Sequence, residues 1–254
     1  MTDNFLTEVR GNVLVMTINR PQVKNAMDGV TARAMAAAMD RLDQSPELFV
    51  GVLTGAGRTF CAGMDLKAFL AGDTPEVAGR GMGGITETPP RKPLIAAVEG
   101  WALAGGLEMA LACDLIVAGV GAKFGVPEVK RALVAAGGAA LRLPEAIGSA
   151  RAMEFLLTGD PVTATRAEQI GLINRVVPDG TALDCALELA TTIAGNGPLA
   201  VQATKAVALG ARDWDNTERW DRQRGIVGTV FTSEDAQEGA TAFAERRAPV
   251  WKGR

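Results

Sequence analysis

Two glutamates, Glu108 and Glu128, lie 20 residues apart in sequence that is otherwise glycine-rich and apolar. A carboxylate among apolar neighbours is costly unless it is paired or hydrogen-bonded. Two carboxylates that meet at one cavity can hold a water molecule and move protons. The chain contains no histidine, so proton transfer near neutral pH falls to carboxylates, lysine or cysteine. The two glutamates are therefore the candidate catalytic residues.

The composition excludes several other kinds of site. Without histidine there is no Cys/His zinc site and no Ser-His-Asp or Cys-His catalytic system. The three cysteines, Cys61, Cys113 and Cys185, lack the spacing of metal ligands, so no metal is expected. A net charge of −3 is unlike that of a general nucleic-acid binder. We expect neither a metal nor a nucleic acid among the partners.

The location is predicted from the same residues. An odd number of cysteines without a signal-peptide pattern indicates a reduced, cytoplasmic protein. The most apolar stretch, residues 94–120, is interrupted by Glu99, Glu108 and Asp114. A membrane span does not normally carry three acids. This stretch is predicted to be a buried strand, helix and strand, with no membrane contact.

Alternating strands and helices are predicted to position the two glutamates. Short apolar runs predict strands at residues 13–18, 50–53, 94–98, 115–118 and 173–177. Asp28 is placed to cap a helix, and Gly105-Gly106 opens another that continues through residue 112. Thr163 or Thr165 starts a short helix, with Glu168 placed for a capping box with Thr165. The chain is helical from Thr181 onward, and the whole pattern indicates an α/β fold.

Two loops of small residues precede predicted helices. One comprises residues 60–65, and the other is Gly105-Gly106. Backbone N–H groups in such loops can reach an anionic oxygen, as an oxyanion hole requires. Either loop alone would be an ordinary turn; Glu108 alone could satisfy a helix dipole, and Glu128 could be a solvated turn residue. The two loops and two acids in this order favour a catalytic function.

A third glycine-rich string, residues 79–84, matches the dinucleotide-binding fingerprint in its letters alone. That fingerprint requires a strand before it and a helix after it. Here nothing strand-like precedes the string and a proline-rich turn follows it. A nicotinamide-dependent oxidoreductase is therefore disfavoured.

The order of these motifs resembles the crotonase (enoyl-CoA hydratase/isomerase) superfamily over essentially the whole chain. The segments that carry the resemblance are residues 20–26, 60–66, 92–100, 104–114 and 122–128, with further matches at 157–159, 167–172 and 242–247. Within the superfamily, the ending at residues 245–254 is similar to that of carnitinyl-CoA dehydratases and related bacterial hydratases. These motifs are specific because they occur together and in this order.

The resemblance implies a fold and an assembly. The expected fold is a crotonase-like spiral of β-β-α units with a helical C-terminal region that drives trimerisation. The expected division places the spiral and the active site in residues 1–195, and the helical region in residues 196–254. The expected assembly is a homotrimer or a dimer of trimers, and the tail is expected to cover the CoA site.

The resemblance also implies an activity, which is the reversible addition of water to a 2-enoyl-CoA thioester by a carbon-oxygen lyase. Glu108 and Glu128 align with the catalytic glutamates, and the backbone N–H groups of Met64 and Gly105 with the oxyanion hole. No cofactor is implied, since coenzyme A is part of the substrate. The implied CoA contacts are Lys24, Ala26, Ala62, Asp65, Leu66 and Phe243.

Three alternatives remain on the same scaffold. They are a carnitinyl-CoA dehydratase-type activity, an enoyl-CoA isomerase or hydrolase, and a non-catalytic acyl-CoA-binding protein. Retention of both glutamates and both glycine loops favours the hydratase. The family's Pro-Gly-Ala-Gly-Gly is replaced here at residues 134–138, and residue 104 is alanine where glycine is common. The resemblance therefore does not determine the acyl group.

Overall fold

The computed structural model describes residues 4–254, which are built around a six-stranded sheet with the order β1-β2-β3-β6-β8-β11. Its strands are β1 (Phe5–Arg10), β2 (Val13–Ile18), β3 (Val50–Gly55), β6 (Leu94–Val98), β8 (Leu115–Gly119) and β11 (Arg175–Val177). Every neighbouring pair is parallel except β1 with β2. The five predicted strands are confirmed, the last in shortened form. The edge strand β1 was not predicted, because most of its residues are exposed and give little apolar signal.

A smaller sheet lies beside the first and produces the spiral. It has the order β10-β9-β7, with β7 (Trp101–Leu103), β9 (Lys123–Gly125) and β10 (Val162–Thr163). β6 leads into β7 and then α3 (Gly105–Leu111), while β8 leads into β9 and then the 3-10 helix η2 (Pro127–Arg131). In the preceding turn of the spiral, β3 leads to an isolated bridge between Cys61 and Ala102 and then to α2 (Leu66–Leu70). The predicted spiral of β-β-α units is confirmed.

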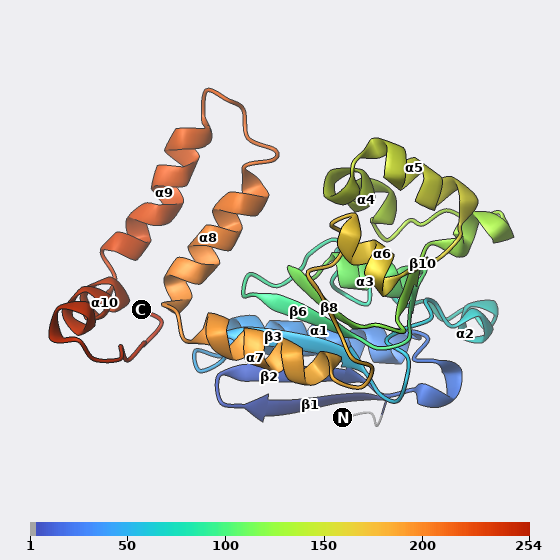
Figure 1. The fold of residues 1–254 in the computed structure, drawn as a ribbon, viewed down its shortest axis with the longest axis horizontal. Helices are drawn as coiled ribbons and strands as arrows, with labels where there is room; N and C mark the ends of the chain where they lie inside the picture. The colour runs from blue at the N-terminus through green and yellow to red at the C-terminus, as the bar shows by residue number, and fades with distance from the viewer. Residues whose placement is uncertain (1–3) are drawn as a thin grey trace.

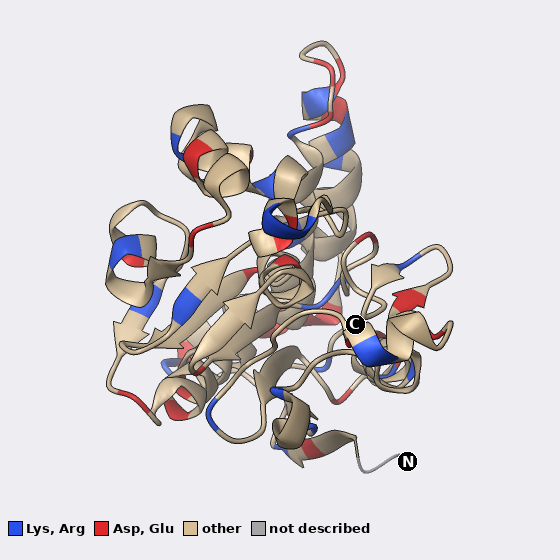
Figure 2. Ribbon diagram, turned by 90° about the vertical axis from the view of Figure 1, so that its right-hand side faces the viewer, with Lys and Arg blue, Asp and Glu red and all other residues tan. Residues whose placement is uncertain are grey.

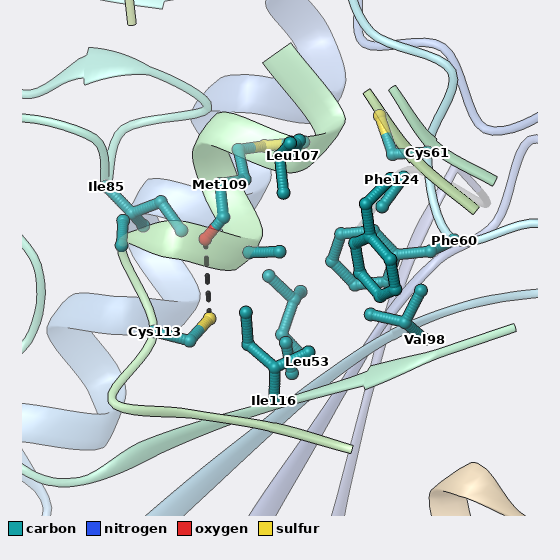
Figure 3. Close-up of a cluster of buried hydrophobic side chains, with 14 of the residues drawn as sticks. Leu53, Phe60, Cys61, Ile85, Val98, Leu107, Met109, Cys113, Ile116 and Phe124 are labelled. Carbon is teal, nitrogen blue, oxygen red and sulfur yellow. Dashed lines mark hydrogen bonds between the residues drawn. The ribbon is translucent and has the colours of Figure 1, made fainter. Parts of the chain in front are cut away.

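The large sheet is buried on both faces, which explains its continuous apolar strands. Along β2, Val13 and Val15 face the helix α7 (Ala182–Ala194), while Leu14, Met16 and Ile18 face the opposite core. In Figure 1, α7 covers one face of the sheet. Figure 3 shows the opposite core, where Leu107 and Met109 of α3 meet sheet residues that include Leu53, Val98 and Ile116. This core fixes α3 against the sheet.

Two predicted helix starts are confirmed, one of them without the capping box that was predicted for it. Asp28 caps α1 (Gly29–Gln44) by accepting a hydrogen bond of 2.8 Å from the Thr31 N–H. For α6 (Ala164–Gln169) the cap is Thr163. The predicted capping box between Thr165 and Glu168 is wrong, because the Glu168 carboxylate accepts instead from the Val176 N–H of β11 at 3.0 Å.

The remaining elements support the cavity or form the tail. They are η1 (Pro21–Val23), β4 (Glu76–Val77), β5 (Gly81–Met82), α4 (Ala139–Ile147), α5 (Ser149–Thr158), α8 (Pro198–Gly210), α9 (Arg219–Phe231) and α10 (Glu234–Glu245). The string at residues 79–84 contains β5 and opens no helix, so it is not a dinucleotide fingerprint.

The tail, α8 to α10, extends away from the sheets (Figure 1). Few of its side chains are buried, and Trp220, Phe231 and Phe243 are 58%, 79% and 88% exposed. Trp251 instead packs against its own chain, where its Nε1 donates a hydrogen bond of 2.8 Å to the Gly195 carbonyl. The tail therefore presents large apolar side chains that the rest of the chain does not cover.

Charged residues of both signs occur together on the face seen in Figure 2. Between residues 4 and 254, no helix has both the length and the apolar character needed to cross a lipid bilayer.

Candidate active site

A cavity of about 570 Å³ opens where the loops after the strands converge. It is lined by Lys24, Ala62, Met64, Leu66, Phe69, Pro75, Glu76, Met82, Trp101, Leu103, Ala104, Gly105, Glu108, Pro127, Glu128, Arg131, Leu133, Val134, Ala136 and Gly137. Most of these side chains are apolar, and both predicted catalytic glutamates are among them. The two acids lie in successive turns of the spiral, in α3 and η2, and meet at one largely apolar cavity.

Glu108 is held firmly in one wall of this cavity. It lies in the first turn of α3, and only 3% of the residue is exposed. Its Oε1 accepts a hydrogen bond of 3.1 Å from the Ala139 N–H at the start of α4. Burial raises the pKa of Glu108 to about 7, and the nearby charge of Glu128 acts in the same direction. Glu108 is therefore poised to gain or lose a proton near neutral pH.

Glu128 lies in the opposite wall, in the first turn of η2. Burial raises the pKa of Glu128 above its usual range, while Arg131 opposes that shift. Its Oε2 is buried and has no hydrogen-bond partner in the described part of the chain. A buried polar atom without a partner is uncommon in native proteins and requires an explanation. A bound water or substrate would supply the missing partner.

Two backbone N–H groups also lack partners at this cavity. Met64 forms a parallel bridge with Met27 in which the bonds run from Met27 N–H to Gly63 O and from Asp65 N–H to Met27 O. That pattern leaves the N–H of Met64 directed away from Met27. Gly105 is the first residue of α3, so no carbonyl of a preceding helical turn is available to accept a hydrogen bond from its N–H group. Within residues 4–254, neither N–H group donates to another protein atom.

Close backbone packing brings the two loops together. Cys61 pairs with Ala102, and a Cβ added to Gly106 would lie 2.2 Å from the Cys61 carbonyl oxygen. Only glycine permits this approach. Ala104 precedes α3 with φ of 52° and ψ of −131°, which is a strained conformation for a residue with a side chain. The glycine that the family resemblance implies at this position would adopt the same conformation with less strain.

The structure brings most of the predicted site residues together. Lys24, Ala62 and Leu66 line the cavity, as do the two glutamates and the residues of the two free N–H groups. Three others, Ala26, Asp65 and Phe243, do not line it. Asp65 caps α2 and pairs with Arg20 at 2.9 Å, so its carboxylate is already occupied. The carbonyl of Ala26 accepts from the Arg20 guanidinium.

Phe243 lies on α10, outside the cavity of its own chain. A contact between Phe243 and CoA would therefore have to come from a neighbouring subunit, which stays a prediction.

Several cavity residues were not predicted from the sequence. Trp101, Arg131, Met82 and Glu76 line the cavity from four separate segments. Arg131 follows Glu128 by three residues, a spacing that could have suggested a contact at the same rim. Met82 and Glu76 lie in residues 71–91, which the resemblance implies to be a wall of the acyl pocket, but no local pattern distinguished these two residues.

The chain is similar to proteins of known sequence and structure over nearly its whole length. Residues 8–254 match the family described as enoyl-CoA hydratase/isomerase. The chain is 46% identical to an enoyl-CoA hydratase of Mycobacterium tuberculosis, over 98% of this chain and 96% of that protein. It is 40% identical to a carnitinyl-CoA dehydratase of Proteus mirabilis, over 100% of both. The crystal structure of an enoyl-CoA hydratase from Mycobacterium marinum matches with a TM-score of 0.98 and 55% identity, over 100% of both chains.

Proposed function

This chain belongs to the enoyl-CoA hydratase/isomerase family, and we propose that it catalyses the reversible addition of water to the double bond of a 2-enoyl-CoA thioester. The observation that carries this proposal is the meeting of Glu108 and Glu128 in one cavity with two unpaired backbone N–H groups. A hydratase needs these four groups together, whereas binding alone needs no pair of acids in the cavity.

The N–H groups of Met64 and Gly105 are proposed to bind the thioester carbonyl oxygen. A simple alkene adds water poorly, but a polarised thioester makes the β-carbon electrophilic when the resulting enolate is stabilised. Preorganised N–H donors provide that stabilisation, and losing one typically raises a barrier by about 3–4 kcal/mol. Their lack of protein partners supports this role, because no internal hydrogen bond has to break when the oxygen binds.

The glutamates are proposed to hold one water molecule between them. Glu108, fixed by Ala139, orients the water and accepts its proton as the oxygen bonds to the β-carbon. Glu128, whose pKa is raised by burial, is proposed to carry the proton that is delivered to the α-carbon. A proton then returns from Glu108 to Glu128 through the next water, so that both groups regain their starting states. Dehydration of a 3-hydroxyacyl-CoA follows the same steps in reverse.

Substrate recognition is proposed to need no cofactor beyond the CoA that the substrate carries. Lys24 lines the cavity and has no ion-pair partner among residues 4–254, so its ammonium group is available for a CoA phosphate. Ala62 and Leu66, which belong to the loop before α2, line the same cavity as Lys24. Contacts of CoA with Ala26 and Asp65 would involve their backbone, since the Asp65 carboxylate is occupied.

We also propose a cytoplasmic homotrimer or dimer of trimers, assembled through residues 196–254. The uncovered apolar side chains of α8 to α10 support assembly, because large exposed apolar patches usually mark an interface. Free cysteines, two of them buried, fit a reducing compartment. Light scattering at micromolar concentration tests the assembly, and a stable monomer would contradict it.

The activity is tested by following the loss of conjugated-thioester absorbance with 2-enoyl-CoA substrates of increasing acyl size. We expect turnover on at least one of them, with a 3-hydroxyacyl-CoA as the product. Migration of the double bond without hydration would indicate the isomerase alternative, and binding without turnover would indicate an acyl-CoA-binding protein.

A further inference from the structure

Two loops at the cavity are joined by backbone hydrogen bonds on both sides of Met64. We call residues 20–28 the arginine loop and residues 60–65 the donor loop, because the latter contains the Met64 N–H group of the proposed oxyanion hole. Met27 donates through its N–H to the residue before Met64 at 2.8 Å, and accepts through its carbonyl from the residue after Met64 at 2.9 Å. The position of the Met64 N–H therefore depends on where the arginine loop holds Met27.

The side chain of Arg20 connects the two loops at the same point. Its Nη1 donates to the carbonyl of Ala26 in the arginine loop. Its Nη2 pairs with Oδ2 of Asp65, which follows Met64, at 2.9 Å, and with Oδ2 of Asp28 at 3.0 Å. The side chains of Arg20, Asp65 and Asp28 are only 12%, 12% and 14% exposed, so salt and water screen these contacts weakly. The guanidinium therefore contacts both loops next to Met64.

The backbone of Arg20 is fixed as well, by the buried side chain of Asn25. The Arg20 N–H donates to Oδ1 of Asn25 at 2.8 Å, and the Asn25 N–H donates to the Arg20 carbonyl at 2.9 Å. Nδ2 of Asn25 donates to the carbonyl of Ala56, just beyond β3, at 2.9 Å. Asn25 has a φ of 55°, in the left-handed region that asparagine adopts more readily than most residues. The arginine loop is thus anchored to the end of a core strand.

Asp28 and Asp65 contact this guanidinium with matching geometry. In each, Oδ1 accepts from N–H groups at the start of a helix, α1 or α2, while Oδ2 pairs with Nη2 of Arg20. Only Asp65 is adjacent to Met64, whereas Asp28 leads into α1. Comparing the two acids therefore separates a local effect on the oxyanion hole from a general loss of the ion pair.

We propose that Arg20 is a positioning residue that keeps the Met64 N–H group directed at the thioester carbonyl oxygen. This role rests on the proposed hydratase activity, and Arg20 itself does not line the cavity. A backbone N–H group has no torsion of its own, so its direction depends on the contacts of the neighbouring residues. A displaced donor weakens stabilisation of the enolate more than binding of the substrate, because the full negative charge on oxygen develops only in the transition state. The loss of Arg20 is thus expected in kcat and not in KM.

Steady-state kinetics of Arg20→Lys test this role. Lysine keeps the positive charge, but its single ammonium group cannot hold the Ala26 carbonyl and both carboxylates as a planar guanidinium does. We expect kcat to fall by about tenfold to a hundredfold, as for a small displacement of a catalytic group, with KM little changed. Lys24→Gln, in the same loop, is expected to raise KM instead. An unchanged kcat in Arg20→Lys would overturn the inference.

Asp65→Asn and Asp28→Asn are the matched pair. Asparagine caps a helix about as well as aspartate, so each variant replaces mainly the contact with Arg20. Asp65→Asn should lower kcat as Arg20→Lys does, while Asp28→Asn should stay near the wild type because the contact beside Met64 remains. Equal losses of kcat in the two variants would overturn the inference. Thermal unfolding shows whether each variant is folded, and Asp65→Asn provides the test if Arg20→Lys is not.

Isotope-edited infrared spectroscopy tests the donor without turnover. The probe is butyryl-CoA with an isotopically labelled thioester carbonyl, a saturated analogue that cannot be hydrated. Its carbonyl stretch should move to lower wavenumber on binding to the wild type, and should move by less in Arg20→Lys and Asp65→Asn. No shift in the wild type, or the same shift in all three proteins, would overturn the inference. If these shifts differ as expected while the wild type hydrates no 2-enoyl-CoA, the role of Arg20 stands and the proposed hydratase activity fails.

Discussion

The two walls of the cavity present the same residue type in different ways. In the α3 wall, Glu108 is almost completely buried and hydrogen-bonded to the Ala139 N–H. In the η2 wall, Glu128 is less deeply buried and leaves one carboxylate oxygen without a protein partner. A fixed acid is suited to orienting a water, and an acid with a free oxygen is suited to exchanging a proton with substrate. The difference in surroundings supports the two roles that we propose.

Removing either carboxylate tests this comparison most severely. Glu128→Gln should lower kcat for hydration by about a thousandfold or more, because the group that gives its proton to the α-carbon is gone. Glu108→Gln should be severely impaired as well, since glutamine cannot accept the proton of the water. Steady-state kinetics with the best enoyl-CoA substrate provide the measurement. Glu154→Gln, an exposed acid of α5, is the control. Near wild-type kcat in either active-site variant would show that its role is wrongly assigned.

A smaller perturbation acts on the α3 wall alone. In Gly137→Ala, the new Cβ would lie 2.5 Å from Oε2 of Glu108, so the carboxylate must move. We expect kcat to fall by about tenfold to a hundredfold, because small displacements of catalytic groups are costly. Gly195→Ala is the matched control, since a Cβ added there would make only ordinary contacts, the nearest at 3.4 Å. An unchanged kcat in Gly137→Ala would mean that the position of Glu108 is not critical.

The cavity mouth should respond differently from either wall. Lys24→Gln removes the ammonium group that we assign to a CoA phosphate, so KM for acyl-CoA should rise by about fivefold to tenfold with kcat little changed. That result is typical of binding energy shared equally by substrate and transition state. Arg10→Gln on the exposed strand β1 serves as the control. A large fall in kcat with unchanged KM would contradict the assignment.

The burial of Glu108 also has a consequence for stability. Its pKa rises from 4.5 to about 7 on folding, so the folded protein binds more protons than the unfolded chain between these values. The free energy of unfolding contributed by this group therefore falls as pH rises through that window, and stays lower above it. Glu108→Gln abolishes the effect, which is worth about 3 kcal/mol.

Thermal unfolding of the two proteins at pH 5 and pH 8 measures this difference. Glu108→Gln should gain a few degrees in Tm over the wild type at pH 8, and less at pH 5. A gain that is the same at both pH values would show that Glu108 does not titrate in this range.

The sequence allowed the fold and the catalytic pair to be predicted for different physical reasons. Strands such as β2 and β6 are buried on both faces, so continuous apolar runs marked them directly. Most residues of the edge strand β1 are exposed, so its sequence contains no continuous apolar run. Glu108 and Glu128 stood out because carboxylates are rare in apolar sequence. Glu76 and Met82 did not, because their place in the cavity depends on a two-residue strand pairing that no local pattern indicates.

Two of the predicted CoA contacts, Asp65 and Phe243, depend on interactions that their own sequence segments do not reveal. Asp65 was predicted as a binding residue, but its carboxylate is used to cap α2 and to pair with Arg20. That use depends on the approach of residues 20 and 65 in the folded chain. Phe243 is exposed on α10, and its proposed contact with CoA depends on a neighbouring subunit.

Glu108 and Glu128 are proposed to add water across the double bond in two different roles. Hydration in heavy-oxygen water and, separately, in deuterated water tests this proposal directly, with mass spectrometry of the product. We expect heavy oxygen on the β-carbon and one deuterium on the α-carbon for the wild type, and neither label in Glu128→Gln or Glu108→Gln over the same time. A wild-type product without heavy oxygen, or full labelling by either variant, would contradict it.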